Sequence, residues 1–497
     1  MYISTRGGNS RFTAAAAIKT GLAPDGGLLV PQELPTLDNS FLNELTALNY
    51  HQRAAKILKL FLDDYSESEI DACLKAAYNN IKFNDAAVAP VVKLNDEASV
   101  LELWHGPTSA FKDMALQLLP QLLSLALKKT GETAKIVILV ATSGDTGKAA
   151  LEGFADVVQT QIVVFYPHHG VSKIQELQMV TQEGGNVAVA AVKGNFDDTQ
   201  TGVKLIFNDQ GYRAKLEQQG FKLSSANSIN WGRLLPQIVY YFSAYADLIN
   251  QGTIKPKQSV NFVVPTGNFG NILAGYYAKL MGLPINKLIC AANNNNVLTE
   301  FLRTGIYNRQ RDFYKTLSPS MDILISSNLE RLLYLVTGDS DKVASWMQEL
   351  TEQGRYQVDA VSLKAIQQNF WSDWASDELT IETIKDVFDQ YHYVMDPHTA
   401  VAWRVYTSYR QQTGDTTPTV VVSTASPFKF SESVLTAIAG KGSVNGKNEF
   451  DVLRELSRLT GWSIPVPLAN LENKEIRHTT VGNKEDMPII VKQALNR

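Results

Sequence analysis

The chain changes its hydrophobic pattern at about residue 97, where short apolar runs begin to alternate with segments of helical periodicity. The runs have the length of β-strands and lie at 136–140, 162–165, 187–192, 260–264 and 420–423. Nearly continuous apolar strands are typical of parallel sheets that helices cover on both faces. We therefore predict an α/β fold with two open, mostly parallel twisted sheets, because a single sheet would account for only part of a chain of 497 residues.

The regions on either side of this pattern differ from it. The first 40 residues are rich in glycine and proline, which indicates turns, and residues 41–77 have apolar positions at helical spacing. Residues 314–390 are predicted to be mainly helical insertions. We predict three units, namely a small N-terminal domain at 1–85, an α/β region of two subdomains at 95–435, and a C-terminal extension at 436–497 that packs on the core.

The composition, net charge and apolar run lengths of the chain exclude several classes of function. The 46 basic and 50 acidic residues give a net charge of −4, so no nucleic-acid partner is expected. Apolar runs stay far below the ~18 residues that a membrane-spanning helix needs, so no membrane partner is expected either. The two cysteines, Cys73 and Cys290, cannot form a disulfide framework, and the N-terminus lacks the order of a signal peptide. These features predict a cytoplasmic protein.

Three turns rich in glycine, serine and threonine follow predicted strands. They read ATSGDTGK at 141–148, PTGNFGN at 265–271 and STASPFK at 423–429. Ligands of open parallel sheets bind where strands end, and the N–H groups of a helix N-terminus can hold an anion. The first turn lacks the Walker A spacing and the second lacks G-x-G-x-x-G, which favours a phosphate without an adenine–ribose half. A plain connecting turn is the alternative for each, and the stronger one for the third.

One lysine stands out by its surroundings. Lys112 ends the segment ELWHGPTSAFK and begins a predicted helix behind a Gly-Pro turn. Burial beside an aromatic residue would lower the pKa of the amine and make it available for Schiff-base chemistry. Most lysines are solvated, so this hypothesis depends on the neighbouring motifs. Histidine pairs with the spacing of metal ligands are missing from the sequence, and no metal site is predicted.

Together and in this order, the segments resemble the threonine synthase family, whose members are pyridoxal-phosphate enzymes of the tryptophan-synthase-β-like group (fold type II). The likeness is carried by HGPTSAFKD at 105–113, TSGDTG at 142–147, NSINWGR at 227–233, PTGNFG at 265–270 and DPHT at 396–399. Near the N-terminus, YISTRG and GLAPDGGLLVP add to it. The resemblance covers roughly residues 1–430. It implies pyridoxal 5'-phosphate as the cofactor and the α/β region as its binding region.

The resemblance also implies roles for particular residues. Lys112 would form the Schiff base, and Thr424 would hydrogen-bond the pyridine nitrogen. The residues that would cradle the cofactor phosphate are Gly267, Asn268, Phe269, Gly270 and Asn271. The substrate-binding residues would be Thr142, Ser143, Asp145 and Thr146, around the α-carboxylate, and Arg233, at the substrate phosphate. Asp145 stands where related enzymes often have Asn, and Ser426 stands where many have His.

The implied reaction converts O-phospho-L-homoserine and water to L-threonine and phosphate, in a monomer or homodimer. Lys112 would remove the Cα proton. Weaker candidates for binding the leaving phosphate are Arg6, Lys148, Lys173 and Lys429. Three alternatives stay open: a serine/threonine dehydratase or β-replacement enzyme of the same fold type, a threonine-synthase-like protein that binds without catalysis, and a nucleotide-binding α/β protein.

Overall fold

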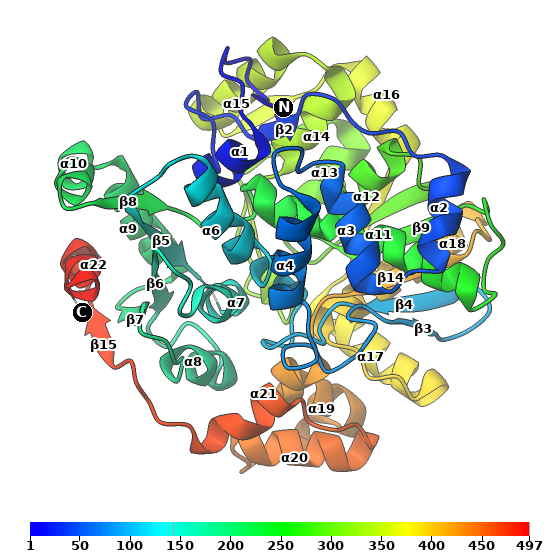
Figure 1. The fold of residues 1–497 in the computed structure, drawn as a ribbon. Helices are drawn as coiled ribbons and strands as arrows, with labels where there is room; N and C mark the ends of the chain where they lie inside the picture. The colour runs from blue at the N-terminus through cyan, green and yellow to red at the C-terminus, as the bar shows by residue number, and fades with distance from the viewer. Residues whose placement is uncertain (143, 497) are drawn as a thin grey trace.

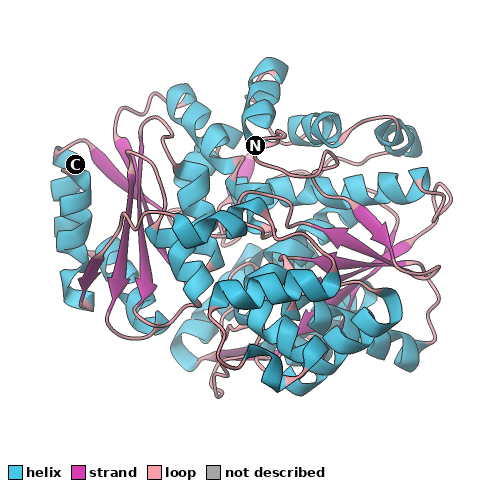
Figure 2. Cartoon of the chain, turned by 90° about the horizontal axis from the view of Figure 1, so that it is seen from below, coloured by secondary structure: helices cyan, strands magenta, loops and turns pink. Residues whose placement is uncertain are grey.

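Two mostly parallel sheets lie side by side, and helices cover both faces of each (Figures 1 and 2). The computed structural model describes residues 1–142 and 144–496. The predicted α/β fold with two mostly parallel sheets is confirmed. Two short antiparallel pairs accompany the sheets, β1 (Tyr2–Ser4) with β2 (Leu29–Pro31) and β11 (Ile306–Asn308) with β12 (Arg355–Gln357).

The larger sheet has six strands in the order β13-β10-β9-β14-β4-β3, and only β3 runs antiparallel to its neighbour. The crossover from β9 to β10 through α12 runs in the opposite direction from the one that reaches β14 through α18. Because such crossovers are right-handed, the two helices cover opposite faces. The elements are β3 (Val91–Lys93), β4 (Ala98–Glu102), β9 (Val260–Pro265), β10 (Ile285–Ala292), β13 (Phe370–Trp374), β14 (Thr419–Ser423), α12 (Gly270–Leu280) and α18 (Pro397–Thr413).

The smaller sheet has five parallel strands in the order β15-β7-β6-β5-β8. Its side chains alternate between two buried faces, as the pleat requires. Val137 and Leu139 of β5 pack with residues of α9 and α22, whereas Ile136 and Ile138 join the main core. The elements are β5 (Lys135–Ala141), β6 (Thr160–Pro167), β7 (Val187–Val192), β8 (Phe221–Ser224), β15 (Thr480–Gly482), α7 (Asp145–Phe154), α8 (Lys173–Val180), α9 (Phe196–Asn208), α10 (Gln210–Gln218) and α22 (Met487–Leu495).

The N-terminal helices pack on helices of the α/β region. Capping boxes begin two of them: Asn49 caps α3 with Gln52 in its first turn, and Ser66 caps α4 with Glu69 in its first turn. The predicted helical pattern of residues 41–77 is confirmed. These elements are α1 (Ala14–Thr20), α2 (Asn39–Thr46), α3 (Tyr50–Lys59) and α4 (Glu67–Ala77), and the helices of the α/β region that they contact include α6 (Leu119–Lys129) and the long α11 (Trp231–Asn250).

The mainly helical stretch at 314–390 also contains β12 and β13, and β13 completes one edge of the larger sheet. The sequence of β13, FWSDW, has two polar residues among its five, so it lacks the apolar run that marks the central strands. The unit boundaries stay a prediction. The remaining helices are α5 (Lys112–Leu116), α13 (Val297–Thr304), α14 (Leu329–Thr337), α15 (Ser340–Gln353), α16 (Ala360–Asn369), α17 (Asp377–Tyr391), α19 (Ser431–Ala439), α20 (Glu449–Thr460) and α21 (Val466–Ala469).

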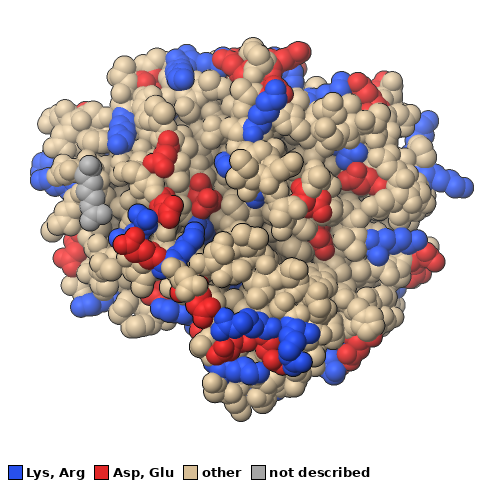
Figure 3. Space-filling model, turned by 60° about the horizontal axis from the view of Figure 1, so that its bottom comes forward, with Lys and Arg blue, Asp and Glu red and all other residues tan. Residues whose placement is uncertain are grey.

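The surface carries both signs of charge. On the face in Figure 3, lysine and arginine side chains are interspersed with aspartate and glutamate, as the near-neutral net charge leads one to expect. Among the helices of the described residues, none is long and apolar enough to cross a lipid bilayer.

Candidate active site

Four segments, each directly after a strand, meet between the two sheets. They follow β4 and β14 of the larger sheet, β9 beside them, and β5 of the smaller sheet. The Lys112 segment and the third predicted turn are joined directly, because Ala110 pairs with Ala425 and the Phe111 N–H donates to the Thr424 carbonyl at 2.8 Å. The sequence motifs are thus brought to the carboxyl ends of parallel strands, where ligands of such sheets bind.

Lys112 begins α5, and its side chain is only 10% exposed. Its Nζ lies 3.2 Å from Ser320 Oγ and 3.9 Å from Asp145 Oδ2, and above the ring of Phe111. Burial lowers the pKa of Lys112 to about 8; Asp145 opposes this shift, and the cations Lys429 and Arg233 add to it. A substantial fraction of the amine is therefore neutral near physiological pH, as a nucleophile or proton acceptor must be.

The second turn forms a narrow backbone cradle before α12. Phe269 has the left-handed φ of 62° directly before the helix begins at Gly270. Gly267 approaches the 319–321 turn so closely that an added Cβ would lie 2.7 Å from the Ser320 carbonyl oxygen. Asn328 fixes the turn from outside, since both its backbone and side-chain N–H groups donate to the Asn268 carbonyl at 3.1 Å. Helix α12 points its N-terminal end at this cradle, which suits an anion.

Asn271 is held in the first turn of α12 by two tyrosines. Its Oδ1 accepts hydrogen bonds from the hydroxyls of Tyr240 at 2.6 Å and Tyr241 at 2.8 Å. Its Nδ2 is buried and has no hydrogen-bond partner in the part of the chain that the structure describes. A buried amide donor without a partner is costly, so this atom suits a polar ligand group.

In the first turn, the hydroxyl of Thr142 makes hydrogen bonds within the turn. The Thr142 hydroxyl accepts from the Gly144 and Gly147 N–H groups, both at 2.9 Å, and therefore holds the turn together. Thr146 is half-buried in the first turn of α7. Ser143, predicted to bind the substrate carboxylate, lies outside the described residues.

Asp145 is the first residue of α7 and is paired with cations. Its Oδ1 lies 2.7 Å from Lys429 Nζ and accepts a hydrogen bond from Gln175 Nε2 at 3.1 Å. Burial alone would raise the pKa of the Asp145 carboxyl, but Lys429 and Lys112 outweigh burial and hold that pKa far below its usual range. Asp145 is therefore a permanent anion beside Lys112.

Arg233 is a buried cation without a carboxylate partner among the described residues. One Nη donates to the Ala226 carbonyl at 2.5 Å, and within residues 1–142 and 144–496 the Nε of Arg233 has no hydrogen-bond partner. Burial lowers the pKa of Arg233 to about 10. The four weaker candidates are already paired with acidic groups, as Arg6–Glu330, Lys148–Glu152, Lys173–Glu176 and Lys429–Asp145. Arg233 is thus the cation best suited to an incoming anion.

Sequence reasoning missed the turn at 319–321, which connects the cradle to Lys112. Ser320 contacts Lys112 through its hydroxyl, and its backbone N–H donates to His398 Nε2 at 3.2 Å. Asp396 Oδ1 lies 2.7 Å from His398 Nδ1 and fixes the imidazole. The DPHT motif signalled the histidine, but no pattern in the sequence signals Ser320 itself.

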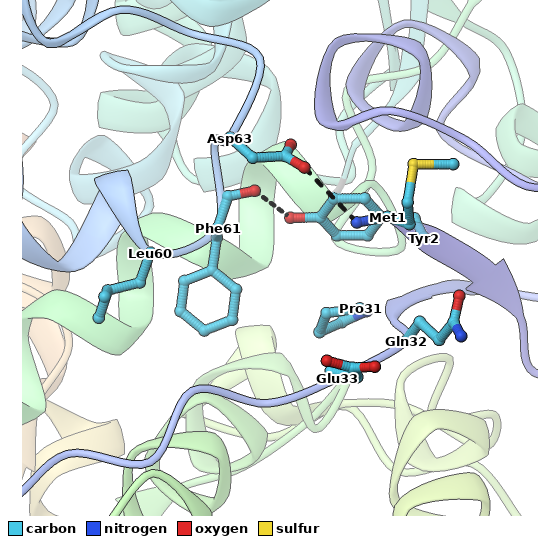
Figure 4. A pocket seen from close by; sticks show the side chains of 8 residues that line it. All are labelled: Met1, Tyr2, Pro31, Gln32, Glu33, Leu60, Phe61 and Asp63. Atoms are coloured by element: carbon cyan, nitrogen blue, oxygen red, sulfur yellow. Dashed lines mark hydrogen bonds and ion pairs between the residues drawn. The ribbon is translucent and has the colours of Figure 1, made fainter.

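Other features carry no comparable chemistry. A surface pocket beside the N-terminus is lined by Met1, Tyr2, Leu60 and Asp63 among others, and none of the predicted site residues lies in it (Figure 4). Within residues 1–142 and 144–496, no group of three or more His, Cys, Asp or Glu side chains could hold a metal ion.

The residues of the site fit pyridoxal phosphate. The cradle at Gly267 offers backbone N–H groups to a phosphate, and a Cβ there would close it. Lys112 offers a buried amine of lowered pKa to an aldehyde, and Asn271 Nδ2 offers a donor that no described residue satisfies. A phosphate-bearing aldehyde matches all three.

Comparisons with known proteins agree with this fit. Three family models match the chain, namely Threonine synthase N terminus at residues 1–78, Pyridoxal-phosphate dependent enzyme at 90–368, and Threonine synthase, C-terminal, at 399–491. Threonine synthase from Saccharomyces cerevisiae is 39% identical over an alignment of 492 positions that covers 93% of this chain and 93% of that protein. The structure of PLP-bound threonine synthase from Brucella melitensis has a TM-score of 0.88 at 37% identity and covers 99% of both chains.

A further relative is longer than this chain. Threonine synthase-like 1 from Homo sapiens is 41% identical over 441 residues, 86% of this chain, and the chain spans 58% of that protein's length. Fold and site define the chain as a pyridoxal-phosphate-dependent enzyme of fold type II. Within that class, the chain belongs to the threonine synthase family.

Proposed function

We propose that this chain converts O-phospho-L-homoserine and water to L-threonine and phosphate, as a carbon–oxygen lyase. The observation that carries the proposal is the position of Lys112. Its buried amine has a pKa of about 8, its Nζ contacts Ser320 of the turn that closes the phosphate cradle, and the charge of Arg233 acts on it. The same site therefore offers an amine for an aldehyde, a cradle for one phosphate and a cation for another.

Each segment has a proposed task. Lys112 binds the aldehyde carbon of the cofactor, residues 267–271 bind its phosphate, and Thr424 hydrogen-bonds its pyridine nitrogen. The turn at 142–146 binds the substrate α-carboxylate with N–H groups at the start of α7. Arg233 binds the substrate phosphate. The support is that Arg233 combines burial with an Nε lacking a partner in the described chain, whereas Thr142 contributes through the turn that it stabilises.

Bound pyridoxal phosphate supplies an electron sink for the negative charge that arises when protons leave the substrate. Lys112 Nζ, once the substrate amine has replaced it, accepts the Cα proton and later returns it. Positioned acid–base groups of this kind contribute roughly 10²–10⁴-fold to a rate. A Cβ proton is also lost, and the phosphate leaves Cγ while Arg233 stabilises its charge. Cγ then takes up a proton and becomes the methyl group, and water adds at Cβ. One water is consumed, and one threonine and one phosphate are released.

The hypotheses that stay open differ in their products. A dehydratase of the same fold type would release a keto acid from serine or threonine, and a β-replacement enzyme would need a second nucleophile. A non-catalytic relative would bind the substrate without releasing phosphate. The buried Lys112, and Arg233 with an Nε that no described residue pairs, favour lyase chemistry on a phosphorylated substrate.

The test is an assay of purified full-length chain, loaded with pyridoxal phosphate, against O-phospho-L-homoserine and against serine and threonine. We expect threonine and phosphate in equal amounts from the first and little keto acid from the others. Lys112→Ala is expected to lose both the Schiff-base absorbance and the activity. Equal keto-acid release by the wild type, or retained absorbance in the variant, would contradict the proposal.

We further propose a cytoplasmic enzyme that is a monomer or homodimer and takes part in threonine biosynthesis. The compartment is supported by the two cysteines, Cys73 and Cys290, which are both buried and free, as is usual in a reducing environment. Sedimentation of the purified chain tests the oligomeric state, and a species larger than a dimer would contradict it.

A further inference from the structure

The site contains a charge pair that the proposed reaction does not use. Lys429 follows β14 of the larger sheet, and Asp145 follows β5 of the smaller sheet, so their ion pair joins the two halves of the site. The Lys429 side chain is fully buried, and its Nζ also donates to the Thr108 carbonyl at 2.9 Å. These two partners take two of the three N–H donors of the ammonium, and its charge is already paired with a carboxylate.

Two lysines compete for the one carboxylate of Asp145. Lys429 Nζ lies 2.7 Å from Oδ1, whereas Lys112 Nζ lies 3.9 Å from Oδ2. The other partner of Lys429 is a carbonyl, which only accepts and therefore requires an N–H donor. The other close partner of Lys112 is the Ser320 hydroxyl, which can donate to a neutral amine as well as accept from an ammonium. The geometry thus assigns the carboxylate to Lys429.

The surrounding charges point the same way. The charged groups that act on Lys112 come from four elements: Asp113 on α5, Asp145 on α7, Arg233 on α11 and Lys429 after β14. Burial raises the pKa of Asp113 to about 6, so its carboxyl is ionised at neutral pH. With both carboxylates charged and Lys429 and Arg233 as cations, the cluster is electroneutral only when Lys112 is neutral. Uncompensated charge in a buried site is costly, which favours proton loss from Lys112.

We propose that Lys429 is a positioning residue that occupies Asp145 and thereby leaves Lys112 as the lysine of the site that gives up its proton. This inference rests on the proposed role of Lys112 and deepens it. Three consequences distinguish it from a purely structural ion pair. Removing Lys429 turns Asp145 toward Lys112 and raises the pKa of the amine; removing Asp145 lowers that pKa; and removing both charges restores a low pKa.

The experiment measures the Lys112 amine in the full-length chain freed of cofactor, so that its outcome does not depend on catalysis. Trace labelling with acetic anhydride, which reacts only with neutral amines, is followed across pH 6–11 by mass spectrometry of the peptide that contains Lys112. The exposed Lys364 on α16 serves as the rate reference. Wild type is compared with Lys429→Met, Asp145→Asn, the double variant and Lys429→Arg, and circular dichroism checks that each is folded.

We expect Lys429→Met to shift the labelling profile of Lys112 upward by a pH unit or more, which at pH 8 means at least about fivefold slower labelling. Asp145→Asn should shift the profile downward. The double variant and Lys429→Arg should both label within about twofold of wild type at pH 8. A Lys429→Met profile that coincides with wild type would overturn the inference, as would a double variant that keeps the shift of the single one. Because no substrate is present, a failed activity assay would leave this result unaffected.

Discussion

Gly267→Ala tests the cradle without touching a polar side chain. The added Cβ would lie 2.7 Å from the Ser320 carbonyl oxygen and 3.3 Å from Met321 Cα, both of which are backbone atoms. The 319–321 turn must therefore move, and overpacking of this kind costs about 1–3 kcal/mol. The cofactor-free chain can relax by opening the turn, whereas a bound phosphate requires the cradle to be closed. The cost is thus expected to appear as lost cofactor affinity.

At 1.4 kcal/mol for each tenfold change, this cost corresponds to a Kd for pyridoxal phosphate about 5- to 150-fold above that of wild type. The assay is an absorbance titration of the cofactor-free chain. Gly270→Ala is the matched comparison in the same loop, because its Cβ would meet nothing closer than 3.4 Å and the substitution keeps the backbone N–H. It should lose much less affinity. A Gly267→Ala chain that binds within twofold of wild type would refute the closed-cradle geometry.

The remaining predictions concern single side chains. The pKa of Lys112 is about 8, and only the neutral amine reacts with an aldehyde. The rate of pyridoxal phosphate attachment, followed by stopped-flow absorbance, should therefore rise about tenfold per pH unit below pH 8 and level off above it. A flat profile from pH 6 to 9 would contradict this. Arg233→Met should raise the KM for O-phospho-L-homoserine about 10- to 150-fold, since a hydrogen bond to a charged group contributes about 1.5–3 kcal/mol. The cofactor absorbance should equal that of wild type. An unchanged KM would exclude Arg233 from the phosphate site. His398→Ala removes the acceptor of the Ser320 N–H and should weaken cofactor binding and lower Tm. His398→Gln supplies a side-chain oxygen as acceptor and should recover most of both. Equal losses in the two variants would contradict a role of His398 in holding the 319–321 turn.

The sequence predicted the parts of the site that are local. Strand runs followed by glycine-rich turns identify the cradle at 265–271, and the position of Lys112 behind a Gly-Pro turn identifies its helix start. Such signals are readable because one short segment contains both the strand and the turn that its end requires. The edge strands β13 and β15 gave no such signal, since one is partly polar and the other has three residues.

The partners of the site residues could not be predicted, because they come from distant segments. Ser320 meets Lys112 across 208 positions, and Lys429 comes to Asp145 from the other sheet. The hydroxyl of Thr142 accepts hydrogen bonds from two N–H groups of its own turn, and the sequence did not signal this role; binding of the substrate by Thr142 stays a prediction. Only the packing of the two sheets decides which polar groups remain available to ligands.

The most direct measurement follows oxygen from solvent to product. Purified chain with pyridoxal phosphate is incubated with O-phospho-L-homoserine in ¹⁸O-water, and both products are analysed by mass spectrometry. Loss of phosphate from Cγ with addition of water at Cβ predicts threonine with one labelled oxygen and phosphate with none. Labelled phosphate together with unlabelled homoserine would mean hydrolysis at phosphorus and would contradict the proposed lyase reaction.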